Sequence, residues 1–369
     1  TSPHLEDFRE RISINGAPIS EEALIFTYND IAAYFDLCDS KFEHPISFFE
    51  AITALAFAAF AEHPVDVGII EVGMGGQWDA TNVVNADVSV VTPIGLDHME
   101  YLGNSLAEIA RTKAGILKSG GYAIFAEQET EAARELMLRA GELEMELARE
   151  GMEYSLSSRE IAVGGQLISV DGLYGQYEDI FLPLHGKHQA HNAATALVAV
   201  EAFFGSEGLD IDAVREAFAT VTSPGRCEIL HRDPTIIVDA AHNPHGAAAL
   251  AQTLQSEFTF DDIIGVVSIF ADKDAEMILR ILEPVMNSII VTQNSSPRAM
   301  PVGDLEKLAR SIFGADRVYA RPTLSEAINT AIEDGKRPLS DDTVGILITG
   351  SVITVGEART IIRRKFAKE

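Results

Sequence analysis

Short β-rich runs alternate with helical segments throughout the second half of the chain, and this alternation constrains the fold more than any other feature. It begins after a Ser-Pro-Gly-Arg break at residues 223–226. Strands are expected at residues 235–239, 263–267, 288–291, 318–319 and 344–348, and helices at 244–258, 275–285, 302–313, 324–333 and 356–368. Strands and helices at this spacing predict an α/β fold with a parallel sheet covered by helices on both faces.

The first half contains similar segments in a less regular order. Residues 66–70, 87–92 and 122–125 are short, apolar runs and are expected to be buried strands, whereas residues 129–150 and 191–204 are expected to be helices. A chain of 369 residues is long enough for about two domains. The break near residue 223 places them at residues 1–222 and 223–369.

The charge balance limits the partners of this chain. It has 28 Lys and Arg against 56 Asp and Glu, a formal net charge of −28. Binding to nucleic acid or to an anionic membrane surface needs a basic face, so neither partner is expected. The two cysteines, Cys38 and Cys227, lie far apart, which favours a reducing compartment and a cytoplasmic location. An anionic substrate would need local cations or metal ions to offset the charge of the chain.

The densest candidate motif is the glycine-rich segment at residues 71–82, which directly follows the expected strand at 66–70. Three glycines permit a tight turn, and Glu71 is expected at the carboxyl end of the strand. Ligands of α/β sheets bind at that edge, and a carboxylate there is suited to hold Mg²⁺. The alternative is a solvated turn with an ordinary surface glutamate.

Asp97 and His98 follow the next expected strand and should reach the same edge of the sheet. A lone histidine in a loop is more often a hydrogen-bonded loop residue, but this position favours a metal ligand. Lys113 lies fifteen residues further on in an expected helix, and its sequence context alone favours an exposed cation.

The second half brings a further set of polar residues to the end of the strand at 235–239. Asp239 and His242 leave the strand together, and Pro244 opens the next helix, whose free N–H groups favour anions. Arg226 lies in the preceding turn and is suited to bidentate phosphate contacts. Gly350 and Ser351 follow the last strand, where they would either approach a ligand or form a packing turn. No GxxxxGK[ST] phosphate loop occurs in the sequence.

Together these motifs resemble the folylpolyglutamate synthases and bifunctional dihydrofolate synthases of the Mur ligase superfamily. The resemblance runs nearly from end to end, and no single motif is decisive. The matching segments are residues 1–5, 11–16, 47–50, 71–82, 95–98, 113–116, 224–226, 239–243, 272–274 and 349–359.

The resemblance implies a Mur-ligase-like ATP-binding domain followed by a C-terminal Rossmann-like domain. It also implies an ATP-dependent amide ligase. MgATP phosphorylates a carboxylate of a pterin-bearing substrate, and the amine of L-glutamate then attacks the acyl phosphate. Mg²⁺ and positioned cations suit this chemistry, because a phosphoryl group moves between two anions.

The resemblance also implies roles for individual residues. Glu71 and His98 match Mg²⁺ ligands, and Lys113 matches a lysine whose carbamylation creates a further ligand, which overturns the reading of Lys113 as an exposed cation. Asn192, Arg226 and Asp239 match ATP-contacting residues, and Lys113, Asp239 and His242 match the catalytic set. The pterin or folate region corresponds to Ser47, Phe48, Phe49, Glu50 and Trp78.

Three departures from the family pattern stand out. The phosphate loop and its serine should precede residue 1, so we expect a segment of order 50 residues, one βα unit with its connection, to be absent from this sequence. Without that segment, weak ligase activity or none is expected. Gln77 stands where the family commonly has arginine, and Ala240 stands where it more often has glycine.

Two rival functions remain open at this stage. One is a Mur-type ligase that adds an amino acid to a cell-wall nucleotide, and the other is an inactive binding homologue without a phosphate loop. We favour a folate ligase that makes both the first and the later glutamate additions. A monomer is expected, and a requirement for a monovalent cation is left open.

Overall fold

The computed structural model describes residues 1–205, 207–336 and 343–367. It contains two compact units, Thr1–Arg149 and Glu150–Glu369. The predicted domain boundary between residues 222 and 223 falls inside the second unit and stays a prediction, because compactness alone does not define a domain.

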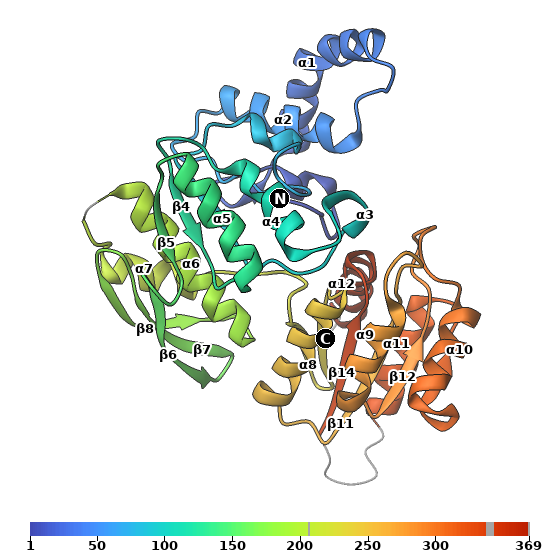
Figure 1. Cartoon of the computed structure of the whole chain (residues 1–369). Helices are drawn as coiled ribbons and strands as arrows, with labels where there is room; N and C mark the ends of the chain where they lie inside the picture. Colours follow the sequence, from blue (N-terminus) through green and yellow to red (C-terminus); the bar gives the residue numbers. More distant parts are fainter. Residues whose placement is uncertain (206, 337–342, 368–369) are drawn as a thin grey trace. The chain divides into compact units, whose positions relative to one another are not determined.

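A six-stranded sheet forms the centre of the second unit (Figure 1). The strand order is β13-β12-β11-β14-β10-β9, and every neighbouring pair is parallel except β9 with β10. The bounds are β9 (Glu228–Arg232), β10 (Thr235–Asp239), β11 (Asp262–Val267), β12 (Ser288–Val291), β13 (Val318–Ala320) and β14 (Val344–Thr349). The predicted parallel sheet is therefore confirmed, and each of its five predicted strands is present.

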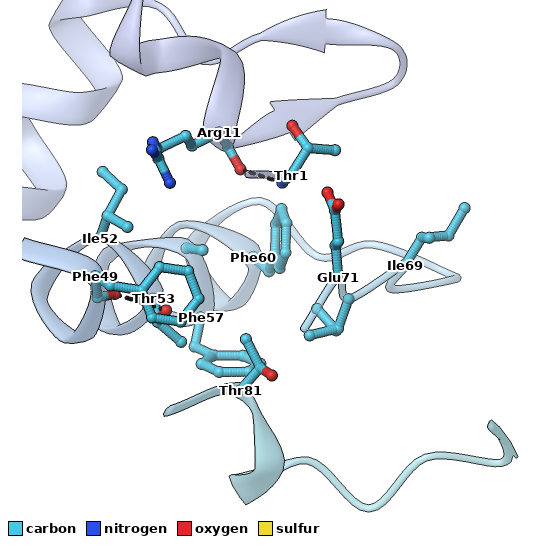
Figure 2. A pocket seen from close by; sticks show the side chains of 12 residues that line it. Thr1, Arg11, Phe49, Ile52, Thr53, Phe57, Phe60, Ile69, Glu71 and Thr81 are labelled. Carbon is cyan, nitrogen blue, oxygen red and sulfur yellow. Dashed lines mark hydrogen bonds between the residues drawn. The ribbon is translucent and has the colours of Figure 1, made fainter. Parts of the chain in front are cut away.

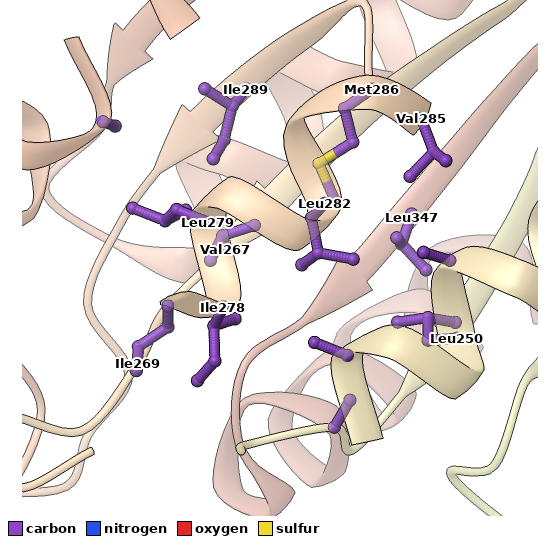
Figure 3. Close-up of a cluster of buried hydrophobic side chains, with 14 of the residues drawn as sticks. Leu250, Val267, Ile269, Ile278, Leu279, Leu282, Val285, Met286, Ile289 and Leu347 are labelled. Carbon is purple, nitrogen blue, oxygen red and sulfur yellow. The ribbon is translucent and has the colours of Figure 1, made fainter. Parts of the chain in front are cut away.

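Helices cover both faces of this sheet, as the alternation predicts. They are α8 (Pro244–Glu257), α9 (Ala275–Leu282), α10 (Val302–Phe313), α11 (Leu324–Gly335) and α12 (Val352–Phe366). Leu250 of α8 and Ile278 of α9 pack on one face against strand residues such as Val267 and Leu347 (Figure 3). Leu305 of α10 belongs to the same buried cluster. Helix α12 starts four residues before the predicted start, and the last residue of the predicted helix, 368, lies outside the described residues.

The second unit also contains an antiparallel sheet that the sequence did not predict. It consists of β6 (Ser155–Ala162), β7 (Gly165–Asp171) and β8 (Gln176–Leu182). Helices α6 (Lys187–Phe204) and α7 (Ile211–Ala219) follow it. Polar residues interrupt β6 and β8, so their alternation is weak, and helix α6 begins four residues before the predicted start at 191.

In the first unit, a parallel sheet of β3 (Val88–Val91), β4 (Tyr122–Phe125) and β5 (Glu146–Arg149) packs against two helices. These are α4 (Leu106–Lys113) and α5 (Thr130–Glu142). The prediction of one helix over 129–150 was wrong, because α5 ends at Glu142. Glu144 adopts a left-handed φ of 51° in the turn, and residues 146–149 pair with β4 as a strand.

The prediction of a buried strand over 66–70 was also wrong. No strand of the described residues pairs with this segment, and the Ile69 side chain is 91% exposed. An isolated extended segment leaves its backbone groups to solvent, so it forms no ladder. Glu71 consequently follows an extended loop rather than a strand.

The rest of the first unit consists of short strands and two helices that precede this segment. They are β1 (Ser13–Ile14), β2 (Ala17–Pro18), α1 (Glu21–Lys41) and α2 (Phe48–Glu62), and α3 (Met99–Leu102) follows later. Ile12, Leu24 and Ile52 contribute to the small core that α1 and α2 share. Within the described ranges, no helix combines the length and the apolar character needed to cross a bilayer.

Candidate active site

The glycine-rich loop at residues 71–82 lies directly on the C-terminal end of α4. Gly76 passes so close that an added Cβ would lie 2.8 Å from the Lys113 carbonyl oxygen. Gln77 N–H donates to the Thr112 carbonyl at 3.0 Å. An added Cβ at Gly73 would lie 2.3 Å from Cζ of Phe49. Only glycine permits both approaches, so these glycines bring three predicted site segments together.

Asp79 holds the shape of this loop. Its carboxylate accepts hydrogen bonds from the N–H groups of Met74 (2.9 Å) and Thr81 (3.0 Å) and from the Thr81 hydroxyl (2.6 Å). The carboxylate therefore closes the loop on both sides. The sequence analysis gave Asp79 no role. An Asp two residues before a Thr is, however, a common signal for such a turn.

Lys113 is the last residue of α4 and is half-buried. Burial lowers the pKa of its amine, and the negative charges of Asp97 and Asp79 oppose that shift. Lys113 is therefore not the exposed cation that its local sequence suggests. Asp97 is the residue before His98, and Asp79 lies in the loop that begins at Glu71. Their effect on Lys113 agrees with the expectation that these two segments lie close together.

Glu71 and His98, the two predicted metal ligands, occupy loops of the first unit. One Glu71 carboxylate oxygen accepts a hydrogen bond from Ser2 N–H at 2.8 Å. His98 precedes α3 in the left-handed conformation, with φ of 51°, and its N–H donates to Asp97 Oδ1 at 2.8 Å. A non-glycine residue in this conformation carries strain that often marks a functional position.

The predicted donor set fits Mg²⁺ only in part. Across the described stretches, no three His, Cys, Asp or Glu side chains lie close enough together to hold a metal ion. Glu71 supplies carboxylate oxygen and His98 an imidazole, whereas a lysine amine is not a ligand for a hard cation. The set gains a third ligand, its second oxygen ligand, only if Lys113 carries a carbamate.

Two of the five predicted pterin residues form the cap of α2. Ser47 Oγ accepts from Glu50 N–H at 3.3 Å, and a Glu50 carboxylate oxygen accepts from Ser47 N–H at 2.8 Å. Hydrogen bonding to Ser47 lowers the pKa of Glu50. Both side chains therefore have a structural role as a capping box, and their role in pterin binding stays a prediction.

The aromatic members of the predicted pterin region differ in their surroundings. The Phe48 ring is exposed and lies under the Arg11 guanidinium, 5.4 Å from its centroid. The Trp78 side chain is 86% exposed. Phe49 lines a cavity of about 50 Å³ together with Phe60 of α2 and Glu71 (Figure 2). A volume of this size holds at most a few water molecules, so this cavity as it stands does not hold a pterin ring.

In the second unit, Asp239 ends β10 at the carboxyl edge of the six-stranded sheet. Its side chain is buried, and its two oxygens accept from Ala241 N–H and Cys227 N–H, each at 2.8 Å. Burial raises the pKa of Asp239, and these hydrogen bonds and the charge of Arg226 oppose the shift. Arg226 is therefore close enough to Asp239 for its charge to act on the pKa of this carboxyl group.

His242 follows Asp239 and precedes the first turn of α8. Its Nδ1 lies 2.9 Å from the Ala240 carbonyl oxygen, which requires the proton on Nδ1 and makes Nε2 the acceptor of the neutral ring. Asn243 caps α8 by accepting from Gly246 N–H at 2.8 Å, and Pro244 is the first helical residue, as predicted. The start of a helix beside Asp239 favours an anion at this edge.

Two other candidates in the second unit have local structural partners. Asn192 lies in the second turn of α6 and donates to Gln189 Oε1 at 3.3 Å. Gly350 adopts a φ of 111°, and an added Cβ would lie 2.6 Å from the Ser268 carbonyl oxygen. The Gly350–Ser351 segment therefore packs closely against Ser268, and an approach to a ligand stays a prediction.

Comparisons with known proteins agree with this architecture. Residues 22–200 match the Mur ligase middle domain, and residues 225–352 match the glutamate ligase domain of Mur ligases. The dihydrofolate synthase/folylpolyglutamate synthase of Mycobacterium tuberculosis is 48% identical over 99% of this chain and 80% of its own length. The Bacillus subtilis protein of the same name is 32% identical over 97% of this chain and 82% of its own length.

Solved structures give the same result. Mycobacterium tuberculosis folylpolyglutamate synthase complexed with ADP and AMPPCP has a TM-score of 0.94 and 50% identity, covering 98% of this chain and 84% of the other. Escherichia coli FolC in complex with DHPP and ADP has a TM-score of 0.85 and 29% identity, covering 99% and 81%. The predicted resemblance and fold class are thus confirmed. The chain belongs to the dihydrofolate synthase/folylpolyglutamate synthase family of the Mur ligases.

Proposed function

We propose that this protein is an ATP-dependent ligase that joins the amine of L-glutamate to a carboxylate of a pterin-bearing substrate in folate synthesis. The observation that carries the proposal is 48% identity over 99% of the chain to a relative named for these two activities. The ADP, AMPPCP and DHPP in structures of relatives support a nucleotide and a pterin as substrates.

The chemistry gives each predicted residue a task. A carboxylate is a poor acyl donor until ATP phosphorylates it, and glutamate then displaces phosphate to form the amide. Arg226 would contact phosphate, and the buried carboxylate of Asp239 and the half-buried imidazole of His242 lie where a helix start favours negative charge. Glu71 and His98 would hold Mg²⁺, which would supply positive charge for the phosphates.

Carbamylation of Lys113 is part of the same proposal. The resemblance to the family supports it, and a carbamate would add a second oxygen ligand to the set of Glu71 and His98. Intact-protein and peptide mass spectrometry in bicarbonate buffer should find the mass increment of CO₂ at Lys113. Its absence from a protein that is fully active would remove Lys113 from the metal set.

We further propose that the enzyme adds both the first glutamate and later ones, because relatives over nearly the whole chain are named for both activities. A monomeric state, a cytoplasmic location and a requirement for a monovalent cation stay predictions. The pterin-region motif favours the folate branch over a Mur-type cell-wall ligase.

The function is tested by following ADP release with three acceptors. Purified full-length protein receives ATP, Mg²⁺ and L-glutamate with dihydropteroate, tetrahydrofolate or a UDP-muramoyl substrate. Both pterins should give glutamylated products by mass spectrometry. Turnover of the nucleotide sugar alone would replace the folate assignment by the cell-wall ligase, and ATP binding without turnover of any acceptor would favour an inactive homologue.

A further inference from the structure

A buried ion pair joins the last helix to the turn that carries Arg226. Arg359 of α12 contacts the carboxylate of Glu228, the first residue of β9. The Arg359 side chain is 8% exposed and that of Glu228 is 24% exposed. Arg359 ends the Gly-Glu-Ala-Arg part of a motif that the sequence analysis singled out, and the proposed function gives it no role.

Glu228 transmits this contact to the turn at residues 223–227. The oxygen of Glu228 that contacts Arg359 also accepts from Gly225 N–H at 2.7 Å. The Gly225 carbonyl in turn accepts from Ala240 N–H at 2.9 Å. The turn is therefore tied on one side to α12 through Glu228 and on the other side to the loop that follows Asp239.

The turn needs such anchors because its backbone is strained. Gly225 has a φ of 74°, which glycine adopts freely, but Cys227 has a φ of 46°, which is unfavourable for a residue with a Cβ. Such conformations persist only where surrounding contacts over-determine them. In this conformation Cys227 N–H donates to Asp239 Oδ2 at 2.8 Å. Arg226 lies between Gly225 and Cys227, whose backbones are both held by hydrogen bonds.

Stability alone does not account for a buried ion pair here. Replacing such a pair by well-packed apolar residues is often neutral or stabilising, because both charges must be desolvated. A directional anchor, in contrast, needs a guanidinium that fixes one carboxylate oxygen in place.

We propose that Arg359 and Glu228 are positioning residues for the nucleotide site, which hold the 223–227 turn so that Arg226 and Asp239 face the phosphates of ATP. The inference rests on the proposed function in its assignment of Arg226 and Asp239 to ATP. The anchoring of the turn by itself depends only on the contacts described above.

The first test measures the turn directly, in the whole protein. Hydrogen exchange of peptides that span residues 223–229 is compared for wild type, Arg359→Met and the milder Glu228→Gln. Both substitutions should speed exchange in this segment, and Arg359→Lys should restore protection in part. Arg280→Gln is the matched control, because Arg280 pairs with Glu276 on the exposed side of α9, and it should leave this segment unchanged. Unaltered protection in Arg359→Met, or in Glu228→Gln if the former fails to fold, would overturn the proposal.

The second test asks whether the anchor acts through Arg226. Displacing a phosphate-contacting group by ~1 Å costs up to about 10²-fold, so Arg359→Met should raise the KM for ATP by tenfold or more and leave the KM for glutamate unchanged. In an Arg226→Ala background the same substitution should have no further effect on the KM for ATP. An additive effect, or an equal rise in both KM values, would show a general structural role and contradict the inference. Absence of ligase activity in wild type would instead refute the proposed function, and the exchange measurement would still decide whether the anchor exists.

Discussion

Glu257 provides the sharpest stability prediction for the second unit. It is the last residue of α8, where the helix dipole disfavours a carboxylate, and its side chain is fully buried. The carboxylate contacts Arg159 of β6 and accepts from Gly186 N–H at 2.9 Å, and His185 Nδ1 lies 3.1 Å away. Glu257 thus joins the antiparallel sheet and the start of α6 to α8.

We predict that Glu257→Gln destabilises the second unit by about 3 kcal/mol. Removing one partner of a buried ion pair costs about 3–5 kcal/mol, and the lower end applies because glutamine still accepts one hydrogen bond. For a unit of this size, this corresponds to a fall in Tm of roughly 6–12 °C. Urea unfolding followed by circular dichroism at pH 7 measures the difference, with Glu276→Gln on the exposed surface as the control.

The same variant makes a prediction about pH. Burial acts to raise the pKa of Glu257, but hydrogen bonds from His185 and Gly186 and the charge of Arg159 outweigh it, so the pKa is lowered. A lowered pKa in the folded state adds stability that is fully present above the ordinary value of ~4.3 and is lost as pH falls through the folded value. The difference in the free energy of unfolding between wild type and Glu257→Gln should therefore become smaller below about pH 4. A difference in the free energy of unfolding within ~0.5 kcal/mol at pH 7, or a difference that stays the same at low pH, would refute this reasoning.

Four further predictions concern single positions. Gly76→Ala should lower kcat/KM strongly and Tm only slightly, because the added Cβ would displace the loop from the Lys113 carbonyl. Activity equal to that of wild type would contradict the close approach. Lys113→Met should abolish turnover while far-UV circular dichroism stays unchanged, and turnover near the wild-type rate would exclude Lys113 from the site. Glu201→Gln should cost about 1–3 kcal/mol in urea unfolding, because the buried carboxylate accepts from two backbone N–H groups and the Tyr177 hydroxyl. Burial raises the pKa of Tyr177 to about 12, and its hydrogen bond to Glu201 acts in the same direction. The absorbance of Tyr177 should therefore titrate near that pH, and titration near 10 would contradict its burial.

Regular alternation made the C-terminal sheet predictable from sequence. Its strands are buried on both faces and are bounded by turn residues, so strand β10 and helix α10 have the predicted bounds. The antiparallel sheet was missed because β6 carries polar residues at both exposed and half-buried positions, which hides the period of two.

The errors in the first half have a common cause. Whether an extended segment becomes a strand depends on a partner elsewhere in the chain, and local composition does not report that partner. Residues 66–70 have the composition of a strand and no pairing partner in the described part of the chain, whereas residues 146–149 read as helix and pair with β4.

Residue types predicted the candidate site better than they predicted its contacts. The glycine-rich loop and the segment ending in His98 were expected to meet because both were placed after neighbouring strands. One of those strands is absent from the portion of the chain that the structure describes, but acidic residues of both segments act on Lys113. The sequence contains the Ser-x-x-Glu capping-box pattern at Ser47 and Glu50, but it did not separate this role from a ligand site, which uses the same residue types. Nor did it reveal the anchor of Arg359 on Glu228, which joins residues 131 positions apart.

The most direct test of the central claim is the coupling of ATP hydrolysis to glutamate addition. With dihydropteroate or tetrahydrofolate and ¹⁸O-labelled acceptor carboxylate, the account predicts one ADP per amide formed and transfer of one ¹⁸O atom to the released phosphate. Amide formation without label in the phosphate would contradict the acyl-phosphate route. Failure of both pterins, in a protein that turns over another acceptor, would contradict the assignment to folate synthesis.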